Sequence, residues 1–427
     1  VLIFADNGIL VKKGLDGDVK FVASDNNSNG IILSWEDTRS ERNAYASWIT
    51  PLGDMLDYNG KHTTFYDIDI KEETNPIPQV LLTDDSFYSL SYSTETGASL
   101  IKINRLNSNL ENSWDSTGIN IYESSGDQIS PILFDTPNGL GCIWSDFTNF
   151  IDYDIYYQII NDNGEPTLQA PGVFIANTIY KDDYAVAVYP THDGNLIVIL
   201  YEQATQNEKY KAKKIDYNGN VITEWQGGEI TIAGPYFRPQ NMVTEVIDSV
   251  GILLAWNEDN NFGLDIKVQI LKWDGTTVWP QGGIYATTHA NDQANVSMDI
   301  TPDNATALIV WEDFQNGVDY NISGQLVDIQ NEVLLGENIL FTTDTSYQYI
   351  PKVKNLNNDQ FLLVWEDERG RWNPDPTKSI GADLYQTWYS ISNNSFELDG
   401  IPLVQQYHKQ KDIQFAELSS TELLVYW

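Results

Sequence analysis

LIVWED, residues 308–313, is the stretch that decides the fold, because related versions of it recur along the chain. Each copy is an apolar run ending in Trp or Tyr, and in the strongest copies acidic residues follow. The aromatic residue returns roughly every 55 residues, a period typical of stacked or radially arranged units that cannot bury their apolar faces alone. Its positions are Trp35, Tyr92, Trp144, Tyr201, Trp256, Trp311, Trp365 and Tyr426.

Each repeat consists of four short extended runs, most clearly in the third copy. Segments 130–135, 140–144, 154–160 and 172–176 are separated by Gly, Asn, Asp and Pro, which is typical of an antiparallel meander. The second run is apolar on both faces and therefore needs cover from both sides. We expect the repeated Trp to wedge between neighbouring units. No segment keeps a 3.6-residue apolar period, so helix is a minor component.

Counting the units predicts the architecture. The unit at the C-terminus lacks its third and fourth strands, while Ile9–Val11 reads as a fourth strand without a unit of its own. We therefore predict a single all-β domain over residues 1–427, an eight-bladed β-propeller of four-stranded antiparallel blades. Blades 1–7 span about residues 17–406, and residues 1–12 share the eighth with residues 409–427, which leaves no exposed edge. A seven-bladed ring is the alternative.

The repeats resemble those of large secreted or surface-attached bacterial β-propeller proteins. W-x-D, a turn, D-I-Y-x-Q and then G-[IV] carry this resemblance, best in segments 144–165, 256–275 and 311–331. In that family the propeller often precedes a sorting domain for type IX or similar export. The resemblance implies an extracellular or cell-surface location and assigns no activity. The chain starts at Val1 without a signal pattern, so we interpret it as a mature or trimmed chain.

Charge and composition exclude several classes of partner. The chain has 24 Lys and Arg against 61 Asp and Glu, a net charge of −37, which argues against nucleic acid and anionic membrane surfaces. No apolar stretch is long enough to insert into a bilayer. The single cysteine, Cys142, excludes an intrachain disulfide and a thiolate metal site. We expect a protein or glycan partner at the cell surface; the oligomeric state is open, and self-assembly is compatible with the repeats.

No catalytic residues are predicted from motifs. The four histidines, His62, His192, His289 and His408, lie in different repeats in loop-like contexts. None of the motifs G-x-S-x-G, H-E-x-x-H or the P-loop is present. Paired carboxylates for glycoside cleavage stay possible, but so many acidic residues make any chosen pair a weak signal.

Acidic residues after the second strands form the candidate metal site, and no other cofactor is expected. Strand order places these loops on one face of the ring, and oxygen ligands at this density suit Ca²⁺. None forms a D-x-D-x-D-G loop, however, and a repeated Asp also caps turns by accepting backbone N–H bonds. The candidate ligands are Asp37, Asp146, Asp259, Asp313 and Asp367.

One loop is roughly twice the usual length, and long loops on a rigid scaffold often bind ligands. It lies between Asp367 and Asp383 and contains Arg369, Arg371 and Trp372. A Trp flanked by guanidinium groups suits stacking on a sugar or anchoring a protein partner, and we name these three as candidate ligand-binding residues. The alternative is that Trp372 packs over the neighbouring blade.

Three functions remain in play. The favoured hypothesis is a non-enzymatic extracellular binding or scaffolding module that engages protein or glycan through one propeller face. The alternative is a carbohydrate-active enzyme with carboxylates in the central depression. A self-assembling surface filament or sheath subunit is a further alternative. An enzyme should show non-repeating polar residues from two or three blades converging near the axis, whereas a scaffold should repeat all the way inward.

Overall fold

The computed structural model describes most of the chain from β1 to β30. The described residues are 19–27, 30–37, 43–50, 61–62, 80–82, 87–93, 98–107, 109–114, 118–204, 207–235, 237–260, 263–287, 289–369, 381–405, 413–419 and 422–426. Within them the chain is β-structure and loops, apart from one 3-10 turn at Gln226–Gly228. No helix in this part of the chain is long and apolar enough to cross a membrane.

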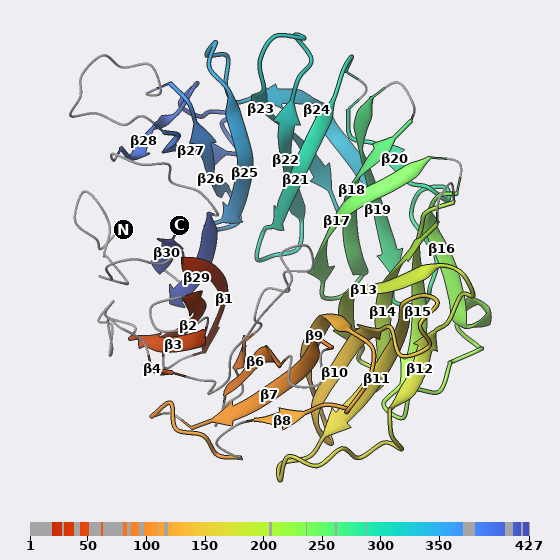
Figure 1. Ribbon diagram of the computed structural model, residues 1–427. Coiled ribbons are helices and arrows are strands. Elements are labelled where there is room, and N and C mark those ends of the chain that lie inside the picture. Colours follow the sequence, from red (N-terminus) through yellow and green to blue (C-terminus); the bar gives the residue numbers. More distant parts are fainter. Residues whose placement is uncertain are drawn as a thin grey trace.

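The strands of the described residues form seven four-stranded antiparallel sheets and one two-stranded sheet, each built in chain order (Figure 1). The first four sheets contain β1 (Val19–Asn27), β2 (Gly30–Asp37), β3 (Asn43–Ile49) and β4 (Lys61–His62); β5 (Val80–Leu82), β6 (Phe87–Ser93), β7 (Leu100–Leu106) and β8 (Ile119–Asn120); β9 (Gln128–Thr136), β10 (Gly139–Asp146), β11 (Asp154–Ile160) and β12 (Val173–Ala176); and β13 (Asp182–Pro190), β14 (Asn195–Gln203), β15 (Lys209–Asp216) and β16 (Glu229–Ala233).

The remaining sheets follow the same order. They contain β17 (Arg238–Ile247), β18 (Gly251–Asp259), β19 (Leu264–Lys272) and β20 (Ile284–Tyr285); β21 (Gln293–Ile300), β22 (Thr306–Asp313), β23 (Asn321–Asp328) and β24 (Val333–Leu340); β25 (Gln348–Asn355), β26 (Gln360–Asp367), β27 (Asp383–Ser390) and β28 (Ile401–Val404); and the pair β29 (Gln414–Ser419) and β30 (Glu422–Tyr426). The predicted four-strand repeat is therefore confirmed wherever all four strands are described.

The sheets are arranged around a central region, with the first strand of each sheet on the inside (Figure 1). First strands of successive sheets contact each other, as β1 does β5 and β21 does β25. The pair β29–β30 lies between the seventh sheet and the first, because β29 contacts β1 and β2 and Val425 packs with Val364 of β26. This arrangement fits a β-propeller. The strand predicted at Ile9–Val11 lies outside the described residues, and no described sheet joins strands from both ends of the chain.

The repeated Trp lies between neighbouring sheets, as predicted. Trp144 belongs to the same apolar cluster as Leu90 and Ile103 of the second sheet, and Trp311 packs with Ile266 of the fifth. Each of the four Trp anchors with described side chains is fully buried, and together they are the largest such side chains. Burial of a ring this large between two sheets explains why an isolated unit would not be stable.

The glycine before the fourth strand makes room for that ring. A Cβ atom at Gly400 would lie 2.3 Å from Cη2 of Trp365, and one at Gly283 would lie 2.8 Å from Cη2 of Trp256. Both glycines also have a positive φ that other residues rarely adopt. The Trp ring can therefore pack in this place only because a glycine stands before the fourth strand of the same unit.

Candidate functional site

The repeated Asp after the second strand is held by hydrogen bonds within its own sheet. Asp146 is buried and accepts hydrogen bonds from Nε1 of Trp144 at 3.1 Å, from Nε2 of Gln128 at 3.1 Å and from the backbone N–H of Thr148 at 2.8 Å. The last contact closes the turn that begins the loop. These contacts match the turn-capping interpretation.

The same contacts recur in later sheets. Asp313 accepts hydrogen bonds from Nε2 of Gln293 at 3.2 Å and from the backbone N–H of Gln315 at 3.1 Å. Asp367 accepts one from Nε1 of Trp365 at 3.0 Å. The sequence analysis missed the Gln at the start of the first strand, although it follows the same period at Gln128, Gln293 and Gln348.

Asp259 differs from the other candidate calcium ligands. Its sheet carries one extra residue between Trp256 and the acidic pair, so Glu258 occupies the register position that Asp146 has in the third sheet. Asp259 is consequently more exposed and lies 3.9 Å from Arg238. The side chain of Asp37 is outside the described part of the structure. No group of three or more His, Cys, Asp or Glu residues within the described ranges is arranged to hold a metal; calcium stays a prediction.

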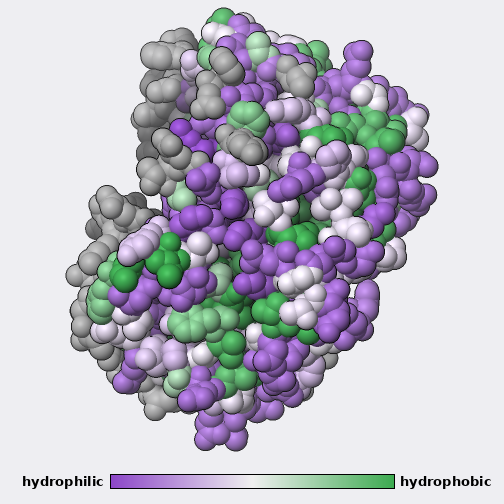
Figure 2. Space-filling model, turned by 90° about the vertical axis from the view of Figure 1, so that its right-hand side faces the viewer, coloured by the Kyte–Doolittle hydropathy of each residue, from purple (hydrophilic) through white to green (hydrophobic). Residues whose placement is uncertain are grey.

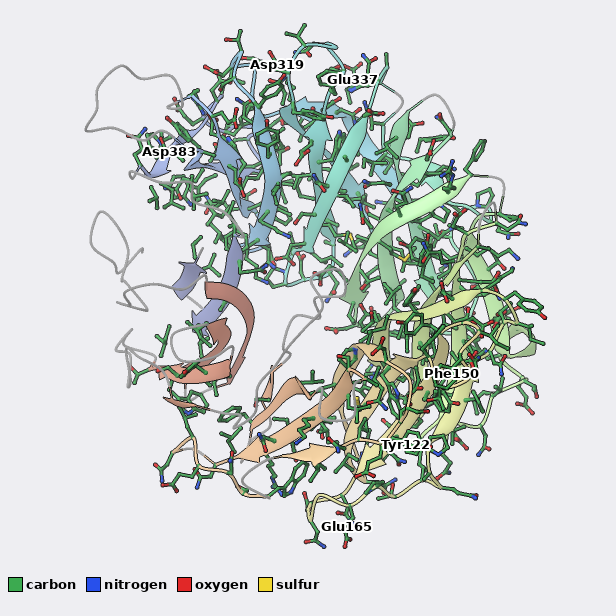
Figure 3. The ribbon with its side chains drawn as sticks, in the orientation of Figure 1. Tyr122, Phe150, Glu165, Asp319, Glu337 and Asp383 are labelled. Carbon is green, nitrogen blue, oxygen red and sulfur yellow. The ribbon has the colours of Figure 1, made fainter. Side chains whose placement is uncertain are left out.

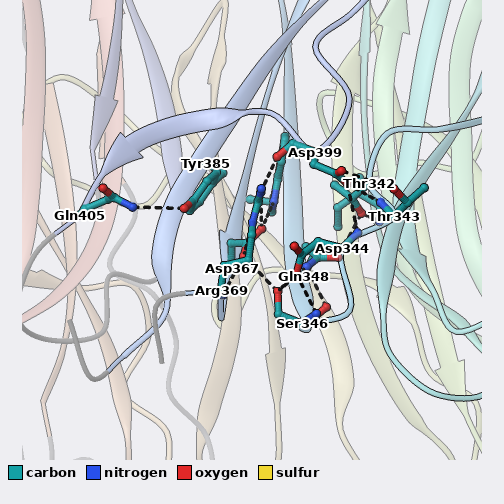
Figure 4. Close-up of polar contacts among 12 residues, drawn as sticks. Thr342, Thr343, Asp344, Ser346, Gln348, Asp367, Arg369, Tyr385, Asp399 and Gln405 are labelled. Carbon is teal, nitrogen blue, oxygen red and sulfur yellow. Dashed lines mark hydrogen bonds and ion pairs between the residues drawn. The ribbon is translucent and has the colours of Figure 1, made fainter. Parts of the chain in front are cut away.

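Arg369 is the part of the long loop that the structure describes, and it binds its own sheet (Figure 4). Its Nε and Nη2 donate to the two carboxylate oxygens of Asp367 at 3.0 and 2.8 Å, and the guanidinium lies 3.9 Å from the centre of the Tyr385 ring. A second donation goes to the backbone carbonyl of Asp399. Arg371 and Trp372 lie outside the described residues, so their ligand-binding role stays a prediction.

One register position on the innermost strands carries charged residues in some sheets and apolar residues in others. Glu245 of β17, Asp299 of β21 and Lys354 of β25 each pair with the residue three before the aromatic anchor of their sheet. The same position is apolar in the second, third and fourth sheets and acidic in the first and in the two-stranded sheet. Those residues are Val80, Phe134, Val188, Asp25 and Glu417.

This charged group is compact. Nζ of Lys354 lies 3.1 Å from Oδ2 of Asp299, and the same oxygen accepts hydrogen bonds from the backbone N–H of Asn355 at 2.8 Å and from its side-chain amide at 2.7 Å. Asp299 is buried, and its other oxygen accepts a hydrogen bond from the N–H of Ile300. Burial, together with the negative charge of Asp299, raises the pKa of Glu245 to about 7.

The charged group lies near the ends of the first strands, beside the turns into the second strands. Glu245 is two residues before the end of β17 at Ile247, and Asp299 is next to the end of β21. The acidic loops leave the opposite ends of these sheets. Non-repeating polar residues from three sheets therefore meet near the axis. They lie at the face opposite the acidic loops, whereas the sequence pattern had indicated the face that carries those loops.

A second cluster surrounds His289. This side chain donates from Nδ1 to Oδ2 of the buried Asp313 at 3.0 Å and lines a hollow of about 370 Å³ between the fifth and sixth sheets. Tyr285 and Glu337 also line it, and Glu337 lies at the outer edge of the sixth sheet (Figure 3). In the third sheet the equivalent partner of Asp146 is Ser124. His289 therefore differs from the residue at the equivalent position of the third sheet. A motif search does not detect a single difference of this kind.

No known protein family and no characterised protein sequence matches this chain. Several solved structures resemble it in fold. An ulvan lyase of polysaccharide lyase family PL25 is 10% identical with a TM-score of 0.48, covering 81% of this chain and 88% of that chain. A prolyl endopeptidase has 10% identity and a TM-score of 0.47 over 82% of this chain but only 47% of that chain. The α-L-arabinofuranosidase Arb93A from Fusarium graminearum has 10% identity and a TM-score of 0.40, covering 70% and 89%.

These comparisons correct one expectation of the sequence analysis. The chain was expected to be a non-enzymatic binding or scaffolding module, whereas the three similar structures named above are a lyase, a peptidase and a glycosidase. The favoured hypothesis is therefore wrong. The repeats dominate the sequence, and Glu245, Asp299 and Lys354 carry no motif, so sequence reasoning did not single them out. At this level of identity the likeness concerns the fold and assigns no reaction.

Proposed function

We propose that this protein is a carbohydrate-active enzyme that cleaves glycosidic bonds, with Glu245 as the group that transfers the proton. The single observation that supports it is a half-buried Glu245, whose pKa is raised to about 7, beside an Asp299 that pairs with Lys354 and accepts a hydrogen bond from Asn355. A carboxyl group with a raised pKa next to a second carboxyl group is typical of acid–base catalysis on glycosides.

In this proposal Glu245 is protonated near neutral pH and donates its proton to the oxygen of the leaving sugar as the glycosidic C–O bond breaks. A water molecule then forms the new C–O bond at the anomeric carbon and gives its proton to the Glu245 carboxylate, which returns the group to its starting state. Asp299 is a positioning residue, because all its contacts go to protein groups: its negative charge keeps the proton on Glu245 and stabilises positive charge that develops on the sugar. Lys354 pairs with Asp299 and holds it in place.

The choice of a glycan over other substrates follows from charge and chemistry. A net charge of −37 disfavours nucleic acids and other polyanions. The single cysteine, Cys142, is fully buried and its pKa is raised by burial, so it does not serve as a nucleophile. Glycoside cleavage requires only carboxyl groups and water, which the innermost strands provide.

The test is polysaccharide breakdown by wild type and by Glu245→Gln, measured as release of reducing ends from a panel of neutral and amino-sugar polymers. Glu245→Gln should reduce kcat by about 100-fold or more, since general acid catalysis contributes that much. Wild-type activity should fall as pH rises above about 7, where Glu245 loses its proton. Glu224→Gln, on the surface, is the matched control. Full activity in Glu245→Gln would reject the assignment.

The hollow around His289 is the competing location for the same chemistry. There Asp313 orients the imidazole, an arrangement that suits a general base. Loss of activity in His289→Gln together with full activity in Glu245→Gln would move the reaction to this hollow, between the fifth and sixth sheets. Loss in Glu245→Gln alone keeps it at the innermost strands.

We further propose the remaining features of the protein on the basis of its sequence. The chain forms one domain whose eighth blade is shared between residues 1–12 and 409–427, and it works outside the cell. The loop that carries Arg371 and Trp372 contacts the glycan. Ca²⁺ at one or more of the acidic loops stabilises the protein and takes no part in the reaction.

A further inference from the structure

A hollow of about 430 Å³ opens between the third and fourth sheets, at the face from which the acidic loops leave. Ile151 and Asp152 line it from the loop after β10, Tyr180 and Asp182 from the connection into β13, and Glu208 from the loop after β14. Phe150, in the same loop as Ile151, is labelled in Figure 3. The hollow lies on a different pair of sheets from Glu245 and from His289.

Two of its carboxylates are already bound by the protein. Oδ1 of Asp182 accepts a hydrogen bond from the backbone N–H of Tyr153 at 3.0 Å. Asp152 accepts one from the backbone N–H of Tyr180 and another from Nδ2 of Asn149 at 2.6 Å. These bonds fix the walls of the hollow. They leave its charge negative, because the donors are neutral amides.

Glu208 is different, because it is buried and one of its carboxylate oxygens has no hydrogen-bond donor among the described residues. Only 8% of the residue is exposed, and Oε2 is buried without a hydrogen-bond donor among the described residues. A buried carboxylate oxygen without a donor is costly, and a bound cation at the hollow would satisfy it. The nearby lysines do not supply a donor: Lys181 and Lys209 both pair with Glu202.

The rim of the hollow is apolar and exposed. Tyr180 is 82% exposed and Ile151 is 59% exposed, and Phe150 and Ile179 beside them in the sequence are exposed as well. Large exposed apolar side chains around a polar hollow mark a binding surface. On the side of the molecule shown in Figure 2, apolar side chains lie in groups among hydrophilic ones. The hollow therefore combines negatively charged carboxylates in its lining with the aromatic side chain of Tyr180 at its rim.

We infer that this hollow binds an amino sugar with a free ammonium group. The ammonium donates to Glu208 and to the carboxylates beside it, and the apolar face of the pyranose ring lies on Tyr180. The net charge of −37 favours such a cation over neutral or acidic sugars. As a statement about substrate class, a glucosamine-containing polysaccharide, the inference rests on the function proposed above; as a statement about binding, it stands alone.

The test is isothermal titration with the β-1,4-linked tetramer of glucosamine, compared with the tetramer of N-acetylglucosamine, whose amines are neutral. Wild type should bind the first and bind the second at least about tenfold more weakly. Glu208→Gln should weaken binding about tenfold or more by removing the charge, and Tyr180→Ala by roughly fivefold. Glu165→Gln, at the outer edge of the third sheet (Figure 3), should leave binding unchanged. Tyr180 is so exposed that its replacement leaves folding intact.

Three outcomes overturn the inference. Equal affinity for both tetramers would show that the ammonium is not recognised. Tighter binding of tetralysine, lost in Glu208→Gln, would assign the hollow to a basic peptide. A Ca²⁺ titration that Glu208→Gln abolishes, with no sugar binding, would assign it to a metal. Titrations repeated with Glu245→Gln separate the two proposals. If this variant binds the glucosamine tetramer, amino-sugar binding at the hollow is supported, even if Glu245 proves not to be the proton donor.

Discussion

At the scale of single residues, environment gives two glutamates opposite properties. Burial acts to raise the pKa of Glu202, but hydrogen bonds from Lys181 and Lys211 outweigh it and lower that pKa to about 2. Around Glu245, burial and the nearby Asp299 both act to raise the pKa, which rises to about 7. The side chains are chemically identical, so only their neighbours determine which one is ready to hold a proton.

Glu245→Gln should change stability in a pH-dependent manner. Because the folded pKa is above the ordinary value of 4.5, wild type loses stability as pH rises from about 4.5 through 7, whereas Gln has no charge to bury. The variant should be more stable than wild type by about 2 kcal/mol above pH 7 and equal to it below pH 4.5. Urea unfolding at several pH values measures this. A difference that does not vary with pH would contradict the shifted pKa.

Asp146→Ala should be strongly destabilising and Asp259→Ala should not be. Asp146 is buried and binds the indole of Trp144, the amide of Gln128 and the turn that follows, so its removal should cost about 2–4 kcal/mol. Asp259 is more exposed and its ion pair with Arg238 is long at 3.9 Å, so its removal should cost about 0.5 kcal/mol. Thermal unfolding compares the two; equal losses would show that the turn-capping contacts are not what stabilises this position.

At the scale of elements, a bulge in the first strand joins neighbouring sheets. One residue with positive φ interrupts β17, β21 and β25 at the same register position, at Asn241, Asn295 and Ile350. The backbone N–H of Ile350 donates to Oε1 of Glu312 in the sixth sheet at 2.6 Å, and Asn295 donates to the same oxygen at 2.7 Å. Two bulges on adjacent sheets therefore share one buried carboxylate.

Ile350→Asn should stabilise the protein. A branched side chain is disfavoured at φ of 48°, while Asn tolerates this conformation and occurs at the equivalent position in two other sheets. The gain should be about 1 kcal/mol by urea unfolding. The reverse variant, Asn295→Ile, should cost more than that, since it also removes the hydrogen bond to Glu312. A destabilised Ile350→Asn would mean that packing of the isoleucine outweighs the backbone strain.

At the scale of the whole molecule, the sheets depend on each other for burial. The sixth sheet packs on both sides, through Trp311 against the fifth and through Phe341 against Trp365 of the seventh. In a ring of such sheets, every sheet is covered on both sides only if no sheet is missing or incomplete. Among the described sheets, the two-stranded one has the fewest strands.

Removal of residues 1–12 should lower the melting temperature by about 5 °C or more and promote association, if they complete the eighth blade as we propose. An open edge beside the two-stranded sheet would pair with other molecules. Calorimetry and light scattering measure both effects, and replacement of the same residues by a Gly/Ser segment of equal length is the control. Unchanged melting would favour the seven-bladed alternative, in which these residues contribute no strand.

The sequence by itself determined the repeat, the four-strand unit and the position of the Trp between sheets, because these features recur and each copy repeats the same local physics. Asp146 as a turn cap was also readable, since its spacing from Trp144 is constant. Glu245, Asp299 and Lys354 lie more than fifty residues apart in sequence from one another, and only the stacking of three first strands brings their charges together. Charge interactions depend on distance in space, so tertiary structure alone decided which of the many acidic residues form a site.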